Sequence, residues 1–271
     1  MRESLCGRPD SKPIPWVFLI PGSLLILFIL LPVGAAVLST SPELLFDTLG
    51  DSAVLRTLGR TVFCAAAATG AAFLMGIPLA YLLARTQFPL KWLISGLIDL
   101  PIVIPHTAAG IALILVYGRQ APVGELLNQA GIICTDTNTG IILAMLFVSL
   151  PFLVNGAREA FSLIDTELEA AAMTDGATAW GAFRHVTLPM AWRGITAASL
   201  QMWGRGMSEF GAVVILAYNP KTIPVLVFEQ FAGFGLQAAQ PIAVLLIITA
   251  LILFAAIRLL LLYRSPVSHQ S

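Results

Sequence analysis

The feature that most constrains this chain is a set of six mostly apolar stretches, each about as long as a helix needs to cross the roughly 30 Å hydrocarbon core of a bilayer. Lipid offers no hydrogen-bonding partners to backbone amides, so a stretch that lies in a membrane must be helical. Hydrophobic residues make up 58% of the chain and charged residues only 11%, which leaves too few charges to solvate a soluble globule. We therefore predict an all-α, polytopic membrane protein with about six transmembrane helices. The predicted spans are residues 16–38, 61–83, 92–117, 139–155, 194–216 and 241–262.

A polar segment with Arg2, Arg8 and Lys12 precedes the first apolar stretch, as it would in a secretory signal. The stretch is too long for the apolar region of a signal and more spans follow it, so we predict that it is the first transmembrane helix. We see no linker to a second folded domain. The predicted organisation is an N-terminal segment over residues 1–15, one transmembrane domain over 16–264 and a short tail over 265–271.

Positive charges predict the orientation of the spans, because Lys and Arg are retained on the cytoplasmic side. If the N-terminus lies inside, most Lys and Arg residues fall in cytoplasmic segments or near the cytoplasmic ends of the spans. Both termini, and the loop of about residues 157–193 between the fourth and fifth spans, are therefore predicted to be cytoplasmic in a multi-pass protein of the cell membrane. The cytoplasmic set is Arg2, Arg8, Lys12, Arg85, Lys91, Arg158, Arg184, Arg193, Arg258 and Arg264, and the external set is Arg56, Arg60, Arg119 and Lys221.

Two local patterns favour a packed bundle over an isolated membrane anchor. Ala68, Ala72 and Gly76 recur at four-residue spacing in the second span, which lets a neighbouring helix approach closely. Pro101 and Pro105 predict a bend in the third span.

The composition argues against several classes of function. The net charge is zero, so we expect no basic surface for nucleic acid. Cys6, Cys64 and Cys134 lack the spacing of metal or redox motifs and are interpreted as packing residues, with no metal site expected. The chain contains no Gly-Lys dipeptide and so cannot hold a Walker A phosphate-binding loop.

The loop between the fourth and fifth predicted spans has signals for a helix, a sharp turn and a second helix. Thr166 and Glu169 have the spacing of a capping box, and Gly176 suits the left-handed residue that ends a helix. Thr178 is placed to cap a second short helix, and Pro189 is expected to break the chain before the fifth span. Such a unit could dock in a groove of another protein or lie on the membrane as an amphipathic connector, and periodicity alone does not separate the two.

The run Ala170-Ala171-Ala172-Met173-Thr174-Asp175-Gly176, followed after nine residues by Val186-Thr187-Leu188-Pro189, resembles the EAA loop of ABC importer permeases. That loop has Glu-Ala-Ala, a Gly four positions after the second Ala, and an aliphatic-x-Leu-Pro ending. Ala170 stands where the motif has Glu, and whether the preceding Glu169 replaces it stays open. The resemblance implies a type I ABC importer permease fold whose loop docks into an ATPase subunit. It implies an ATPase-coupling role for Glu169, Ala171, Ala172, Gly176, Leu188 and Pro189.

Two other stretches resemble permeases for molybdate and tungstate, of which sulfate and thiosulfate permeases are close relatives. They are residues 99–110, and residues 203–212 with the later Asn219-Pro220-Lys221-Thr222. The resemblance covers nearly the whole chain beyond Trp16. It implies import of a tetrahedral oxyanion, molybdate and/or tungstate, with a sulfate or thiosulfate importer as the alternative.

The resemblance also implies how the work is divided among subunits. The implied partners are a second copy of this chain, a cytoplasmic ABC ATPase dimer that binds ATP and Mg, and an extracytoplasmic oxyanion-binding protein. This chain would then bind no cofactor and would not be an enzyme.

Ionisable residues inside the predicted spans need an explanation, because charges in a bilayer are costly. Arg205 lies near mid-membrane and Glu209 follows at i+4, so the two are interpreted either as a structural ion pair or as contacts for a passing oxyanion. Asp99 and His106 would share one face of an unbroken helix. Asp99 is expected to cap a piece of the bent third span, and a proton relay through both residues is the alternative.

These four residues also define a rival from another class, a proton-coupled secondary anion carrier. Such a carrier would need no ATPase. An intramembrane enzyme has less support, because the sequence has no paired Asp, HExxH or Ser nucleophile motif.

Overall fold

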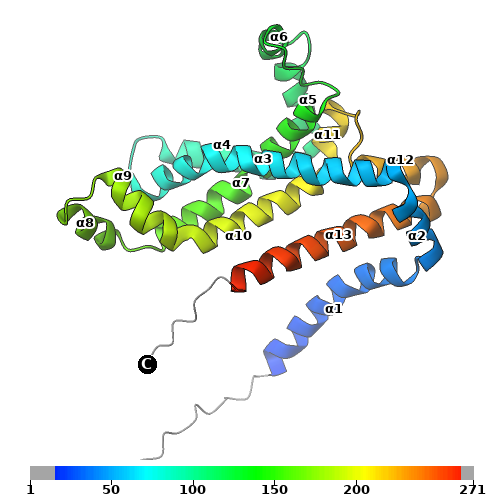
Figure 1. The fold of residues 1–271 in the computed structure, drawn as a ribbon, viewed down its shortest axis with the longest axis horizontal. Helices are drawn as coiled ribbons and strands as arrows, with labels where there is room; N and C mark the ends of the chain where they lie inside the picture. Colours follow the sequence, from blue (N-terminus) through cyan, green and yellow to red (C-terminus); the bar gives the residue numbers. More distant parts are fainter. Residues whose placement is uncertain (1–15, 264–271) are drawn as a thin grey trace, which may run out of the picture.

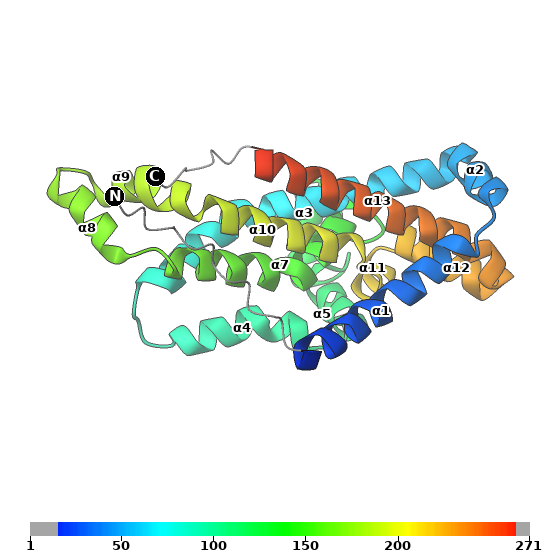
Figure 2. The same ribbon diagram turned by 90° about the horizontal axis from the view of Figure 1, so that it is seen from below.

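A computed structural model describes residues 16–263, and all regular structure in this range is helical. Three long helices form the main bundle: α3 (Ser52–Arg85), α7 (Asn138–Ser162) and α10 (Leu188–Met207). They lie side by side, and α13 (Leu236–Tyr263) runs along one side of them (Figure 1; Figure 2). The prediction of an all-α protein is confirmed.

Small residues let α3 and α7 pack closely. Ala68 and Ala72 of α3 are buried, and Gly76 on the same face lies against Val154 of α7. A Cβ atom added to Gly76 would lie 3.1 Å from the Val154 side chain. The prediction that the second span packs through a face of small residues is therefore confirmed.

Four helices in the described range are long and apolar enough to cross a membrane: α1 (Trp16–Leu38), α3, α7 and α13. The number rises to five if α4 (Lys91–Val103) and α5 (His106–Tyr117) are one bent span. The remaining predicted span, the fifth, corresponds largely to α10, which does not join this set because polar residues such as Arg193, Gln201 and Arg205 lower its hydropathy. It packs instead against α3 and α7 in the centre of the bundle.

Two of the predicted spans are broken. α4 and α5 meet at an angle of 115° beside Pro105, which has no backbone N–H to continue the helix, so the predicted bend is confirmed. The expectation of one helix over 194–216 is wrong, because α10 ends at Met207 and α11 (Gly211–Leu216) is a separate helix. The Glu209 side chain accepts a hydrogen bond from the Ala212 backbone N–H at 2.9 Å, which satisfies one of the free donors that start α11.

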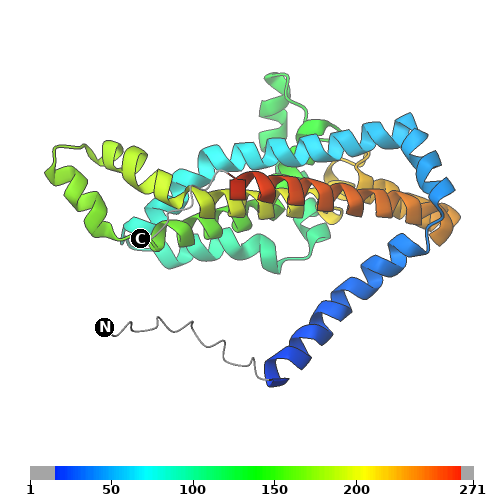
Figure 3. The same cartoon turned by 60° about the horizontal axis from the view of Figure 1, so that its bottom comes forward.

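The shorter helices flank the bundle. α2 (Pro42–Gly50) joins α1 to α3, α6 (Pro122–Gln129) follows α5, and α12 (Ile223–Phe234) precedes α13. α1 lies apart from the bundle and has no buried residue (Figure 3). At the opposite end from α12, the bundle is extended by α8 (Thr166–Thr174), α9 (Ala179–Ala182) and the π-helical turn η1 (Phe183–Thr187) (Figure 1).

Candidate functional site

The loop between α7 and α10 folds into two short helices that project from one end of the bundle (Figure 1). The first helix, α8, is capped by Asp165, whose Oδ1 accepts from the backbone N–H of Glu167 at 3.0 Å. The predicted capping box of Thr166 and Glu169 is wrong. Asp165 takes the capping position, and the Glu169 side chain turns into the protein instead.

The turn between α8 and α9 forms as predicted. Gly176 has φ +96°, and a Cβ there would meet no atom within 4 Å, so the backbone conformation alone favours Gly at this position. The N–H of Ala177 bonds the carbonyl of Ala172 at 3.0 Å and that of Gly176 bonds Met173 at 3.1 Å, which is the Schellman pattern. Thr178 then caps α9, as its Oγ1 accepts from a backbone N–H at 3.1 Å.

The expected break at Pro189 is wrong. Helical structure continues from α9 through η1 into α10, and Pro189 lies in the first turn of α10. In η1 the N–H of Leu188 bonds the carbonyl of Phe183, five residues back. This wider turn lets the chain stay helical although Pro189 has no N–H to donate.

Glu169 is the centre of a buried polar cluster and is only 9% exposed. Its Oε1 accepts from Arg85 Nε at 2.9 Å and from the Thr187 hydroxyl at 2.7 Å, and Arg85 Nη2 lies 2.8 Å from the same oxygen as an ion pair. Its Oε2 accepts from the Tyr81 hydroxyl at 3.2 Å. Arg85 also donates to the Ile164 carbonyl at 3.0 Å. The arrangement joins α8 to α3 and to the start of α10.

The other predicted coupling residues lie on or next to this loop. Ala171 is exposed and Ala172 is half-buried on α8, while Leu188 is half-buried at the start of α10. Ala170, the position of the motif Glu, is also exposed. The sequence reasoning missed Arg85, Tyr81 and Thr187. Arg85 and Tyr81 are spaced i and i+4 at the end of a predicted span, which could have marked a polar face there.

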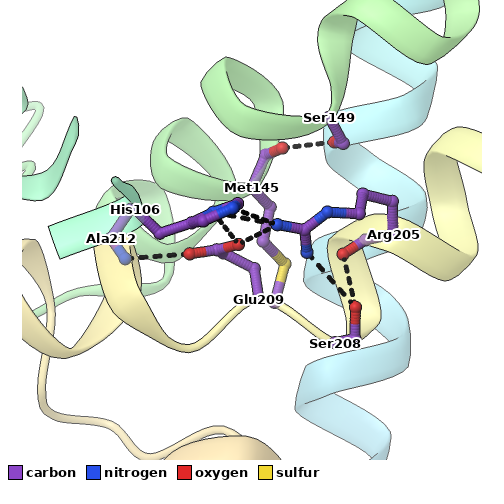
Figure 4. Close-up of polar contacts among 7 residues, drawn as sticks. All are labelled: His106, Met145, Ser149, Arg205, Ser208, Glu209 and Ala212. Carbon is purple, nitrogen blue, oxygen red and sulfur yellow. Dashed lines mark hydrogen bonds and ion pairs between the residues drawn. The ribbon is translucent and has the colours of Figure 1, made fainter. Parts of the chain in front are cut away.

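A second polar cluster lies where the two broken spans meet (Figure 4). Arg205, near the end of α10, donates through Nη2 to Glu209 Oε2 at 2.9 Å, so the expected ion pair is present. His106, the first residue of α5, has Nδ1 2.9 Å from the same oxygen and Nε2 2.9 Å from Arg205 Nη2. Arg is always a donor. Arg205 Nη2 also lies 2.8 Å from His106 Nδ1, so both ring nitrogens face the guanidinium, and the tautomer decides which of them accepts from Arg205 and which donates to Glu209.

Exposure within this second cluster is uneven. The side chain of Glu209 is 2% exposed, whereas those of Arg205 and His106 are 25% and 38% exposed. The Glu209 carboxylate is thus enclosed, whereas the Arg205 and His106 side chains are partly exposed. Contact of Arg205 and His106 with a passing anion stays a prediction.

Asp99 does not belong to this cluster. It lies within α4, where its Oδ1 accepts from Asn155 of α7 at 2.6 Å. The expectation that Asp99 caps a helix piece is therefore wrong, and the structure does not bring Asp99 and His106 together. The Asp99–Asn155 contact depends on how α4 packs against α7, which the sequence does not reveal.

The two cysteines in the described range fit a packing role. Cys64 and Cys134 are free thiols and are buried, and burial raises the pKa of the Cys134 thiol. Cys6 lies outside the described residues. Between residues 16 and 263, no group of three or more His, Cys, Asp or Glu side chains is arranged to hold a metal ion.

These features define the membrane-spanning component of a transport system, and residues 76–265 match the family described as binding-protein-dependent transport system inner membrane component. The chain belongs to this family. It is 39% identical over 245 residues to the molybdate/tungstate transport system permease protein WtpB of Thermococcus kodakarensis. That alignment covers 90% of this chain and 94% of the relative. The identity to a probable sulfate transport system permease protein, cysT of Chlorokybus atmophyticus, is 33% over 252 residues, with 90% and 87% covered.

A solved structure shows the same fold. The crystal structure of a bacterial alginate ABC transporter in complex with an alginate pentasaccharide-bound periplasmic protein contains a chain that aligns with a TM-score of 0.69. The alignment covers 89% of this chain and 91% of that chain at 17% identity. The family resemblance inferred from the loop and spans is confirmed.

Proposed function

We propose that this chain is the permease subunit of an ABC importer that carries molybdate and/or tungstate into the cell. The main support for this substrate is the 39% identity to a molybdate/tungstate permease over nearly the whole of both chains, compared with 33% identity to the sulfate relative. Sulfate is the alternative cargo, since all three anions are tetrahedral and doubly charged.

The proposed assembly is a homodimer of this chain with a cytoplasmic ATPase dimer and an external oxyanion-binding protein. ATP and Mg would be bound by the ATPase, and this chain would catalyse no reaction. Both termini and the α8–α9 loop would face the cytoplasm. ATP binding would close the ATPase dimer, draw the two loops together and open the pathway outward to receive the anion.

The shape of the α8–α9 loop supports a docking role. The Schellman turn at Gly176 and the Thr178 cap hold the two helices at a fixed angle. Leu168, Met173 and Trp180 on the projecting helices are 43%, 46% and 66% exposed, which gives a partner an apolar surface to contact.

Replacing Gly176 with Val tests the coupling role. Val is strongly disfavoured at φ +96° and would distort the turn, so substrate-stimulated ATP hydrolysis and uptake by the reconstituted importer are expected to fall together. Gly176→Asn is the matched control, because Asn tolerates the left-handed conformation. Normal activity of the Val variant would show that the loop does not have this role.

The cargo is tested by competition for the cognate binding protein. Molybdate and tungstate are expected to displace each other at similar concentrations, while sulfate is expected to require a large excess. Equal displacement by sulfate would contradict the assignment.

The rival secondary carrier makes the opposite energetic prediction. Uptake by the importer is expected to stop when ATP is depleted and to survive collapse of the proton gradient. Asp99 bonds Asn155 and His106 contacts Glu209, with no hydrogen bond between Asp99 and His106 among the described residues, which gives a direct relay through both no support. Uptake that follows the proton gradient would favour the carrier.

A further inference from the structure

Helix α8 has a single buried residue, and that residue is charged. Of its nine residues only Glu169 is buried, while its larger apolar side chains, Leu168 and Met173, are exposed. Most helices in proteins are held by the packing of an apolar face, and α8 buries no such face. The Glu169 carboxylate is therefore the main point at which the protein holds this helix.

The donors to Glu169 come from two separate spans of the bundle. Arg85 and Tyr81 lie one turn apart at the end of α3. Thr187 lies where η1 passes into α10. One carboxylate thus connects the projecting loop to both α3 and α10, and Arg85 also holds the segment just after α7 through the Ile164 carbonyl.

The character of these contacts suits the transmission of movement. Bonds between a guanidinium and a carboxylate are strong and fix direction as well as distance. The rings of Phe161 and Phe183 pack against Tyr81 at centroid distances of 5.4 and 4.6 Å, which limits water around the cluster and strengthens its electrostatic contacts. A displacement of α8 is then carried to α3 and α10 through this carboxylate.

We propose that Glu169 is a positioning residue for coupling, which fastens α8 to α3 and α10 through Arg85 and Thr187 and does not itself contact the ATPase. The inference rests on the proposed function and specifies how the loop acts within it. It also explains why Ala is acceptable at position 170. The carboxylate one residue earlier points inward, whereas Ala170 is exposed and has no comparable link to the spans.

The test uses the complete importer in proteoliposomes, with molybdate uptake and ATP hydrolysis measured in the same sample. Glu169→Gln keeps the size of the side chain and an acceptor for Thr187 but removes the charge that faces Arg85. The ratio of molybdate taken up to ATP hydrolysed is expected to fall by between about two-fold and about thirty-fold, the range over which changes along a coupling network act. Glu159→Gln, at an exposed position on α7 outside the α8–α9 loop, is the matched control and is expected to keep the wild-type ratio.

A double variant tests whether the two charges act as one unit. Arg85→Gln is expected to lower the same ratio, and the Arg85→Gln/Glu169→Gln double variant is expected to be no worse than the poorer single variant. Additive losses would overturn the proposal.

Three further outcomes of these experiments would decide between a coupling role and a purely structural role of Glu169, or would test the proposed function itself. A wild-type ratio in assembled Glu169→Gln complex, even with a lower melting temperature, would show a structural role only and overturn the inference. If this variant does not fold, Thr187→Val removes one hydrogen bond onto Glu169 and is expected to give a smaller fall, while an unchanged ratio would again overturn it. Failure of the wild-type complex to couple uptake to ATP would instead contradict the proposed function.

Discussion

Replacing Glu209 with Gln is expected to destabilise the bundle although the two side chains have nearly the same shape. The carboxylate has three contacts, each at 2.9 Å: Oε1 accepts from the Ala212 N–H, Oε2 accepts from Arg205, and His106 Nδ1, which donates when it carries the ring proton, lies against Oε2. A Gln amide has one acceptor oxygen and one donor group. At least one of the three donors must therefore face another donor.

The size of the effect follows from which donor loses its acceptor. If the amide oxygen replaces Oε2, the Ala212 N–H is left unsatisfied in a buried position. If it replaces Oε1, Arg205 faces the amide NH₂ and cannot become an acceptor, whereas His106 can change tautomer. A buried donor without a partner costs about 1–3 kcal/mol, and the partial exposure of Arg205 places the second arrangement at the lower end. We expect a loss of about 2 kcal/mol in the free energy of unfolding.

The assay is reversible unfolding of the purified protein in mixed detergent micelles, followed by circular dichroism. Glu125→Gln on α6 is the matched control, because Glu125 is exposed and makes no ion pair within the described range. The control is expected to lie within about 0.5 kcal/mol of the wild type.

A result for Glu209→Gln that matches the control would refute the view that the buried carboxylate is structural. If that variant were also to lose molybdate uptake while keeping its stability, the cluster would instead be acting on the anion. The two interpretations of Arg205 and Glu209 are therefore separated by measuring stability and uptake on the same protein.

Three further changes test other parts of the structure. Gly194→Val is expected to cost about 1–3 kcal/mol through overpacking, since a Cβ on Gly194 would lie 2.5 Å from that of Ala160; thermal unfolding checks this. Thr178→Ala is expected to cost about 1 kcal/mol of helix stability, seen as faster hydrogen exchange in α9 with little change in α7. A hydrogen bond from Lys221 lowers the pKa of Glu229, so this pair adds stability above the ordinary Glu pKa and loses it as the pH falls through the lowered pKa. The melting temperatures of wild type and Lys221→Met are expected to converge in acid.

The local signals in the sequence predicted local structure well. Gly176 and Thr178 act through hydrogen bonds within five residues, and both take their predicted places. The incorrect predictions concern side chains that bond to residues far away in the sequence. Glu169 leaves its capping position because Arg85 and Thr187 offer it stronger, charge-assisted contacts inside the protein.

The break after Met207 was not predicted for a similar reason. Residues 194–216 are apolar enough to suggest one helix, and no Pro interrupts them. The chain leaves the helix because the Glu209 carboxylate is used by His106 and by the start of α11. The pairing of Asp99 with Asn155 likewise depends on the packing of two helices whose relative register no sequence pattern records.

The continuity of helix through Pro189 has a mechanical consequence. From Thr187 to Arg205 the chain is one uninterrupted helix of about 27 Å, with the Glu169 junction at one end and the Arg205–Glu209 pair at the other. In the proposed importer, α10 would link the loop that faces the ATPase to this second cluster, and the chain breaks just beyond the end of this helix. A displacement that reaches Thr187 through Glu169 would then travel to the junction of the two broken spans along one helix.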